Sequence, residues 1–81
     1  EEIDIMGSYK DSALFAECKW TNERTDVGVL ETLIERSNLF DYEKKHFYLF
    51  AKTGFTKGCH DYAEKMGNVT LVTYEDILKS T

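Results

Sequence analysis

Residues 2–20 read EIDIMGSYKDSALFAECKW, and this stretch decides the fold because two strand patterns flank one short polar segment. Charged and apolar residues alternate over 2–7 with a period of two, which predicts a β-strand. The segment that follows is small or polar and favours a turn near Lys10-Asp11. Residues 13–20 give a second strand pattern, so the whole stretch predicts a β-hairpin.

The length of the turn decides which residues of the hairpin face one another. A two-residue turn places Asp4 opposite Glu17, and a slightly longer turn centred on Asp11-Ser12 places it opposite Lys19. In either register Asp4 shares a face with Glu17 and Lys19, and opposite positions lie about 5 Å apart at Cβ. Two carboxylates and one ammonium group are therefore expected to crowd one patch. The other face is expected to be a core surface made of Ile3, Ile5, Leu14, Ala16, Cys18 and Trp20.

The rest of the chain predicts two strand-helix-strand units without a linker or repeat between them. The expected elements are a helix from 27 to about 40, a strand over 46–51, a helix through Met66 capped by Thr56 and closed by Gly67, a strand over 69–73 and a final helical turn over 74–78. Each unit should be a right-handed crossover with parallel neighbouring strands. The prediction is a single domain over 1–81, a three-layer α/β fold with a mixed sheet in the order β-β-α-β-α-β-α.

Composition limits the classes of function. The chain has 81 residues with 15 Asp and Glu against 10 Lys and Arg, a net charge of −5 and 42% hydrophobic residues. An acidic chain is a poor freestanding nucleic-acid binder, because phosphate affinity comes mostly from Lys and Arg. The apolar runs are too short to cross a membrane, and no leader pattern opens the chain, so a cytoplasmic location is expected. Cys18 and Cys59 are expected to be reduced thiols.

The charged patch of the hairpin has a chemical interpretation and a structural one. Two adjacent carboxylates repel unless a proton or a cation lies between them, and Mg²⁺ is typically held by one or two carboxylates. Lys19 could then neutralise phosphate charge or help to activate a water molecule, which suits hydrolysis of a phosphodiester. Alternatively, Glu17 and Lys19 form a solvated ion pair within one strand. Glu17 lies inside an apolar segment, where a buried carboxylate without a partner is costly.

The segments Ile3-Asp4-Ile5 and Leu14-Phe15-Ala16-Glu17-Cys18-Lys19-Trp20 resemble the signature of the PD-(D/E)XK nuclease superfamily, which has the restriction-endonuclease-like fold. The stretch 53–56, followed by Ala63, Gly67 and 69–71, looks like the matching stretch of Mrr-type relatives. Over 2–78 the chain is most similar to the nuclease-like C-terminal domain that follows a P-loop ATPase in a family of archaeal and bacterial ATPases. The sequence itself contains no P-loop.

The resemblance implies roles for the hairpin residues. Asp4 and Glu17 would bind Mg²⁺ or Mn²⁺, the backbone carbonyl of Cys18 would be a third ligand, and Lys19 would be the catalytic lysine. DNA would be bound through the full-length protein, whose N-terminal part would be the ATPase domain. The sequence departs from the family because Ile3 replaces the proline and no glutamine is present. The first core helix and strand of the superfamily would precede Glu1, so the isolated domain is expected to be inactive.

Three hypotheses for function follow. The first is a metal-dependent endonuclease domain of a larger ATPase, and the second is a catalytically inactive module that positions DNA or binds protein. The third is a small α/β protein in which the hairpin charges are only structural. Without the first helix, the face that holds Met6 and Phe15 is expected to lack cover, which predicts a homodimer.

The remaining polar residues give weaker predictions. His60 adjoins Cys59, but adjacent helical residues do not point together, which disfavours a zinc site there. Lys52, Lys57 and Arg24 are expected near the carboxyl ends of the parallel strands. Ligands commonly bind at that edge of a sheet, so these side chains either contact phosphate or are simply solvated.

Overall fold

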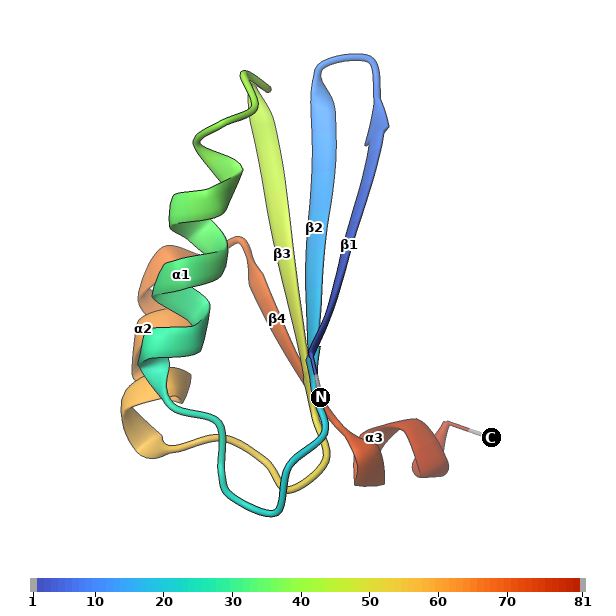
Figure 1. Ribbon diagram of the computed structural model, residues 1–81, viewed down its shortest axis with the longest axis vertical. Helices are drawn as coiled ribbons and strands as arrows, with labels where there is room; N and C mark the ends of the chain where they lie inside the picture. The colour runs from blue at the N-terminus through green and yellow to red at the C-terminus, as the bar shows by residue number, and fades with distance from the viewer. Residues whose placement is uncertain (1, 81) are drawn as a thin grey trace.

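The computed structural model describes the backbone of residues 2–80 and the side chains of residues 5–80. In chain order the elements are β1 (Glu2–Tyr9), β2 (Ser12–Lys19), α1 (Val27–Ser37), β3 (Lys44–Ala51), α2 (Lys57–Met66), β4 (Val69–Thr73) and α3 (Tyr74–Lys79) (Figure 1). This order confirms the predicted succession of strands and helices. None of the helices in the described part of the chain combines the length and the apolarity needed to cross a membrane.

The four strands form one mixed sheet in the order β1-β2-β3-β4. β1 is antiparallel to β2, and the other two pairs are parallel. Tyr9 pairs with Ser12, so the turn has two residues, and Lys10 adopts the left-handed region that such a turn requires, with φ 54°. Of the two predicted registers, the structure has the one that sets Asp4 opposite Glu17.

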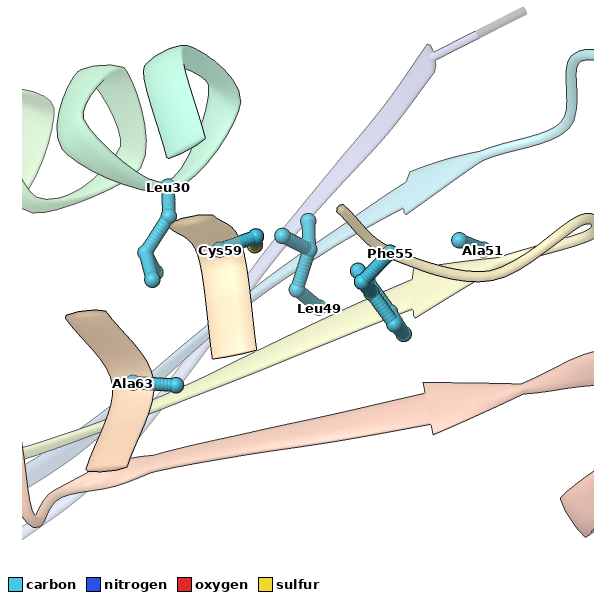
Figure 2. Packing of buried hydrophobic residues seen from close by; sticks show 6 residues of the cluster. All are labelled: Leu30, Leu49, Ala51, Phe55, Cys59 and Ala63. Carbon is cyan, nitrogen blue, oxygen red and sulfur yellow. The ribbon is translucent and has the colours of Figure 1, made fainter. Parts of the chain in front are cut away.

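The core fills the space between the two longer helices and one face of the sheet. Leu30 of α1 and Cys59 of α2 are completely buried beside Leu49 of β3 (Figure 2). A second cluster places Leu33 of α1 beside Phe15 of β2 and Phe47 of β3. Helices α1 and α2 therefore cover the same face of the sheet.

The covered face is not the one that the sequence predicted. On the face that we expected to form the core, Ala16 is buried as predicted, but Leu14 and Trp20 are 40% and 43% exposed. Ala13 and Phe15 on the opposite face are buried. The reason lies in the topology. Both crossovers step in the same direction along β2-β3-β4, and crossovers of one hand then bring both helices to the same side.

The predicted three-layer arrangement is wrong for the same reason. Among the described residues, only the six-residue helix α3 lies on the other side of the sheet, at the carboxyl end of β4 (Figure 1). There the ring of Tyr74 meets the ring of Trp20 edge-on, with 5.1 Å between the centroids. The domain is a two-layer α/β sandwich, and one face of its sheet is largely open.

The prediction that the face around Met6 and Phe15 lacks cover is wrong for Phe15. Phe15 is buried under α1, and its ring packs against Phe47 and Phe40 with centroid distances of 5.7 and 5.9 Å. Met6, on the edge strand β1, is exposed. α1 also ends earlier than predicted, at Ser37, and a turn carries the chain through Phe40 to this contact.

The loops that precede α1 and α2 are joined to each other. The amide of Thr25 donates to the carbonyl of Gly54, and the amide of Thr56 donates back to the carbonyl of Thr25, at 2.8 and 3.0 Å. This bridge extends the parallel pairing of β2 and β3 past their carboxyl ends. It fixes Asp26, which caps α1, beside Thr56, which caps α2.

Candidate functional site in a groove beside the first helix

Glu17 is buried because the side chains of β2 point alternately to the two faces of the sheet. It lies two residues after the core residue Phe15, so its side chain points to the same covered face, where it is 3% exposed. Burying a carboxylate is unfavourable unless a cation or hydrogen-bond donors offset the lost hydration. A residue of this kind needs either a structural partner or a functional reason.

Arg36 of α1 supplies a positive charge next to Glu17. Its Nη1 atom lies 3.6 Å from Oε1 of Glu17, and its side chain is 49% exposed. The contact is longer than a charge-assisted hydrogen bond, which is usually 2.7–2.9 Å. We did not predict Arg36 as a site residue from the sequence. The signal was indirect, because a carboxylate inside an apolar strand calls for a cation from whichever helix covers it.

A groove of about 350 Å³ runs between α1 and β2. Along α1 it is bordered by Gly28, Thr32 and Arg36, which are four residues apart and so form one stripe of the helix. From β2 it is bordered by Glu17 and Lys19. We call this space, lined by Glu17, Lys19, Asp26, Gly28, Val29, Thr32 and Arg36, the α1 groove.

Two of the predicted site residues, Glu17 and Lys19, lie together in the α1 groove. Lys19 is half-buried and shares the face of Glu17, two residues along the strand. The side chain of Asp4 lies outside the described residues, but its backbone pairs directly with Glu17, so its position is on the same face. Cys18 presents its half-buried side chain to the other face, and its backbone lies in the sheet between Ile3 and Phe50.

Asp26 is the second carboxylate that lines the α1 groove among the described residues. It already has a structural role as the N-cap of α1. Its Oδ1 accepts the amide of Val27 at 2.8 Å and the hydroxyl of Thr56 at 2.9 Å. These two hydrogen bonds, the backbone one first, lower the pKa of Asp26 below its ordinary value of 3.8. Burial, followed by the nearby charge of Asp26, raises the pKa of the Cys59 thiol, so this cysteine stays protonated and inert.

The carboxylate of Glu17 is the donor in the α1 groove that a hard divalent cation could use. Mg²⁺ in proteins usually takes one or two carboxylates and completes its octahedron with water and phosphate oxygens. Glu17 offers one carboxylate inside the groove, and the register sets Asp4 across from it. Within the described side chains, no three His, Cys, Asp or Glu residues gather into a ready metal site.

The other polar candidates serve the fold or face solvent. His46 shares a 2.8 Å hydrogen bond with the hydroxyl of Thr70, and the ring of His60 packs edge-on against Phe55 at 5.8 Å. Of the three basic residues predicted at the carboxyl edge, Lys52 donates to Asn22 and Lys57 pairs with Asp61 in α2, while Arg24 lines a smaller pocket of about 280 Å³ next to the α1 groove.

The geometry thus joins a buried carboxylate, a lysine and an arginine in one groove beside the hairpin. Comparison of the chain with protein-family models, with curated proteins and with solved structures found no match.

Proposed function

We propose that this chain is a nuclease-like domain that binds Mg²⁺ or Mn²⁺ together with a DNA phosphodiester in the α1 groove. The observation that carries the proposal is Glu17, a buried carboxylate that shares this groove with Lys19 and Arg36 and faces the position of Asp4. A fold that needed only packing would be served better by an apolar residue at position 17. Keeping a charge there costs stability, which is typical of a functional site.

The residues would divide the work in the following way. Asp4 and Glu17 would hold the cation, with the backbone carbonyl of Cys18 as a third ligand. When bound, the cation would supply Lewis acidity toward a phosphate oxygen. The ammonium group of Lys19 would offset the charge that develops on the phosphate. In hydrolysis, the oxygen of water bonds to phosphorus, the bond to the sugar oxygen breaks, and that oxygen receives the proton that the water gives up.

The net charge of −5 bears on how DNA would be held. Affinity for DNA rests mainly on Lys and Arg contacts to phosphate and falls steeply with salt. A domain with two basic side chains in its groove would bind DNA weakly by itself. Firm binding would need other parts of a larger protein, for which an ATPase domain is our proposal.

Binding of a fluorescently labelled DNA oligonucleotide at low salt tests the proposed function. We expect anisotropy to show binding that requires Mg²⁺ and that Lys19→Met weakens about tenfold, the usual effect of losing one contact to a charged group. Lys44→Met, at an exposed lysine on β3, is the matched control and should bind like the wild type. Equal binding in EDTA, or by Lys19→Met, would refute the proposal. Cleaved DNA in the same samples would show an enzyme.

Binding without cleavage would favour a second candidate, a catalytically inactive interaction module. The observation in its favour is the open sheet face, which carries the exposed residues Ile5, Leu14 and Trp20 and the half-buried residues His46, Tyr48 and Phe50. Sheets with parallel strands are usually covered on both faces, and exposed apolar clusters mark interaction sites. We propose a second copy of the chain as the partner, because one face can meet its own copy across a two-fold axis.

A further inference from the structure

The contact between Arg36 and Glu17 joins a fixed group to a movable one. Glu17 belongs to a strand that is paired on both sides, by β1 and by β3, and its side chain is 3% exposed. Arg36 lies in the last turn of α1, and nearly half of its side chain is exposed. If the two groups separate, the guanidinium can move into water, whereas the carboxylate stays where it is.

The costs of separation are therefore unequal. A half-exposed guanidinium regains its hydration and loses little, since ion pairs of exposed groups contribute only a few tenths to about 1 kcal/mol. A buried carboxylate pays a large desolvation penalty, and the charge of Arg36 offsets part of it. A step that moves Arg36 away from Glu17 therefore costs less when another cation takes its place. A divalent ion at Glu17 would be such a cation.

The displaced guanidinium has a suitable ligand in the proposed function. Arg36 and Lys19 line the same groove, so a phosphate that enters it meets both cations. The planar guanidinium matches two phosphate oxygens at once, a geometry that lysine lacks. Its 3.6 Å contact with Glu17 is not a short hydrogen bond that would have to be broken first.

We propose that Arg36 couples the binding of the cation to the binding of the phosphodiester. In the absence of ligands it neutralises Glu17 and so competes with the divalent ion. When the ion is bound, Arg36 turns to the phosphate of the DNA strand. The inference rests on the proposed function and adds to it the regulation of the same groove. Because coupling is reciprocal, the phosphodiester must strengthen cation binding by the same factor as the cation strengthens phosphodiester binding.

Titration of Mn²⁺ by calorimetry, with and without a thymidine tetranucleotide, tests the coupling. We expect the tetranucleotide to raise the Mn²⁺ affinity of the wild type about tenfold, within the usual range of coupling energies. Arg36→Gln should bind Mn²⁺ about tenfold more tightly than the wild type without the tetranucleotide, because the competing charge is gone, and should gain nothing from adding it.

Two further variants separate charge from shape. Arg36→Lys keeps the competing charge but loses the planar fork, so its Mn²⁺ affinity should match the wild type while the effect of the tetranucleotide is reduced. Arg24→Gln removes an equal charge from the neighbouring pocket and should behave like the wild type in both titrations. Circular dichroism spectra of all variants serve as the check of folding.

The outcomes distinguish the two proposals. If Mn²⁺ binds to the wild type, and Glu17→Gln abolishes this binding while Arg36→Gln does not alter it under either condition, the role of Arg36 is refuted and the proposed function stands. If the wild type binds no Mn²⁺ at millimolar concentration, with or without the tetranucleotide, both proposals are refuted.

Discussion

Glu17 is the residue on which the proposed function of this domain depends. It is a carboxylate with 3% exposure on a strand whose neighbouring inward positions carry Phe15 and Lys19. Its ionised form is stabilised by Arg36, at 3.6 Å, which is itself half exposed. The pair therefore joins a residue that cannot reach water to one that already does. We propose that this arrangement serves ligand binding.

Glu17→Gln tests whether the buried charge is structural. The amide keeps the shape and removes the charge, and Arg36 can hydrate because its side chain is half exposed. We expect the free energy of unfolding in urea to stay within about 1 kcal/mol of the wild type, because the charge that remains belongs to the half-exposed Arg36 and ion pairs of exposed groups contribute at most about 1 kcal/mol. Glu31→Gln, on the exposed side of α1, is the control. A loss of about 3 kcal/mol or more would show that Glu17 holds the fold together.

Leu49 is a central residue of the core. It lies in β3, is completely buried, and belongs to the cluster with Leu30 and Cys59 that both helices share (Figure 2). Leu49→Ala should lower the free energy of unfolding by about 2–5 kcal/mol, because a cavity remains beneath the two helices. Leu39→Ala, at a side chain that is 84% exposed, should change it by less than about 0.5 kcal/mol. Equal effects in urea melts would contradict the assigned core.

At the scale of elements, several boundaries could be predicted because their signals are local. The turn at Lys10-Asp11 and the cap of α2 at Thr56 depend on residues within a few positions along the chain. Gly67 ends α2 in the left-handed conformation, with φ 78°, as its sequence position suggests. The register of the hairpin, and with it the pairing of Asp4 with Glu17, follows from the two-residue turn.

The buried face of the sheet could not be read from the hairpin alone. Both faces of β2 carry apolar residues, Ala13 and Phe15 on one and Leu14 and Ala16 on the other. Which face is buried depends on the side to which the two crossovers bring their helices, a property of residues far along the chain. Arg36 escaped prediction for the same reason, since its partner Glu17 is nineteen positions away in sequence.

The junction of the two helix starts gives a prediction for pH. Asp26 caps α1 and accepts the hydroxyl of Thr56, so its pKa in the folded state is lowered from 3.8, chiefly by the amide of Val27. A lowered pKa contributes stability that is fully present above the unfolded value and is lost as the pH falls through the folded value. The wild type should therefore lose melting temperature as the pH falls below about 4.

Comparison with Asp26→Asn isolates this contribution. The variant should melt at a lower temperature than the wild type at pH 7, and the difference should disappear in acid, where the wild-type carboxyl is also neutral. Asp41→Asn, at an exposed loop position, should follow the wild type at each pH. A difference between wild type and Asp26→Asn that stays constant down to pH 2 would contradict the role given to this carboxylate.

At the scale of the whole molecule, the two faces of the sheet differ in how far they are covered. Both longer helices lie over one face (Figure 1). The other face carries the exposed residues Ile5, Leu14 and Trp20, of which Ile5 is 57% exposed. An apolar cluster of this kind on a small domain favours association. We therefore propose that the open sheet face is the side of the domain that binds a partner.

Self-association follows if a second copy covers the open sheet face. Analytical ultracentrifugation of the wild type should show a dimer whose population rises with concentration, and Leu14→Lys should shift it to the monomer by placing a charge at the contact. Glu64→Lys, on the exposed side of α2, introduces the same side chain elsewhere and should leave the dimer intact. A wild type that stays monomeric at high concentration would refute this use of the face.

The central claim is that Glu17 is kept as a buried charge in order to hold a divalent cation. Calorimetric titration of Mn²⁺ into the wild type, Glu17→Gln and Glu31→Gln tests it most directly. We predict one binding site in the wild type and in Glu31→Gln, and a loss of affinity of at least about tenfold in Glu17→Gln, because one carboxylate ligand is removed. Equal Mn²⁺ affinity in the wild type and Glu17→Gln, or no binding to the wild type at millimolar Mn²⁺, would contradict the claim.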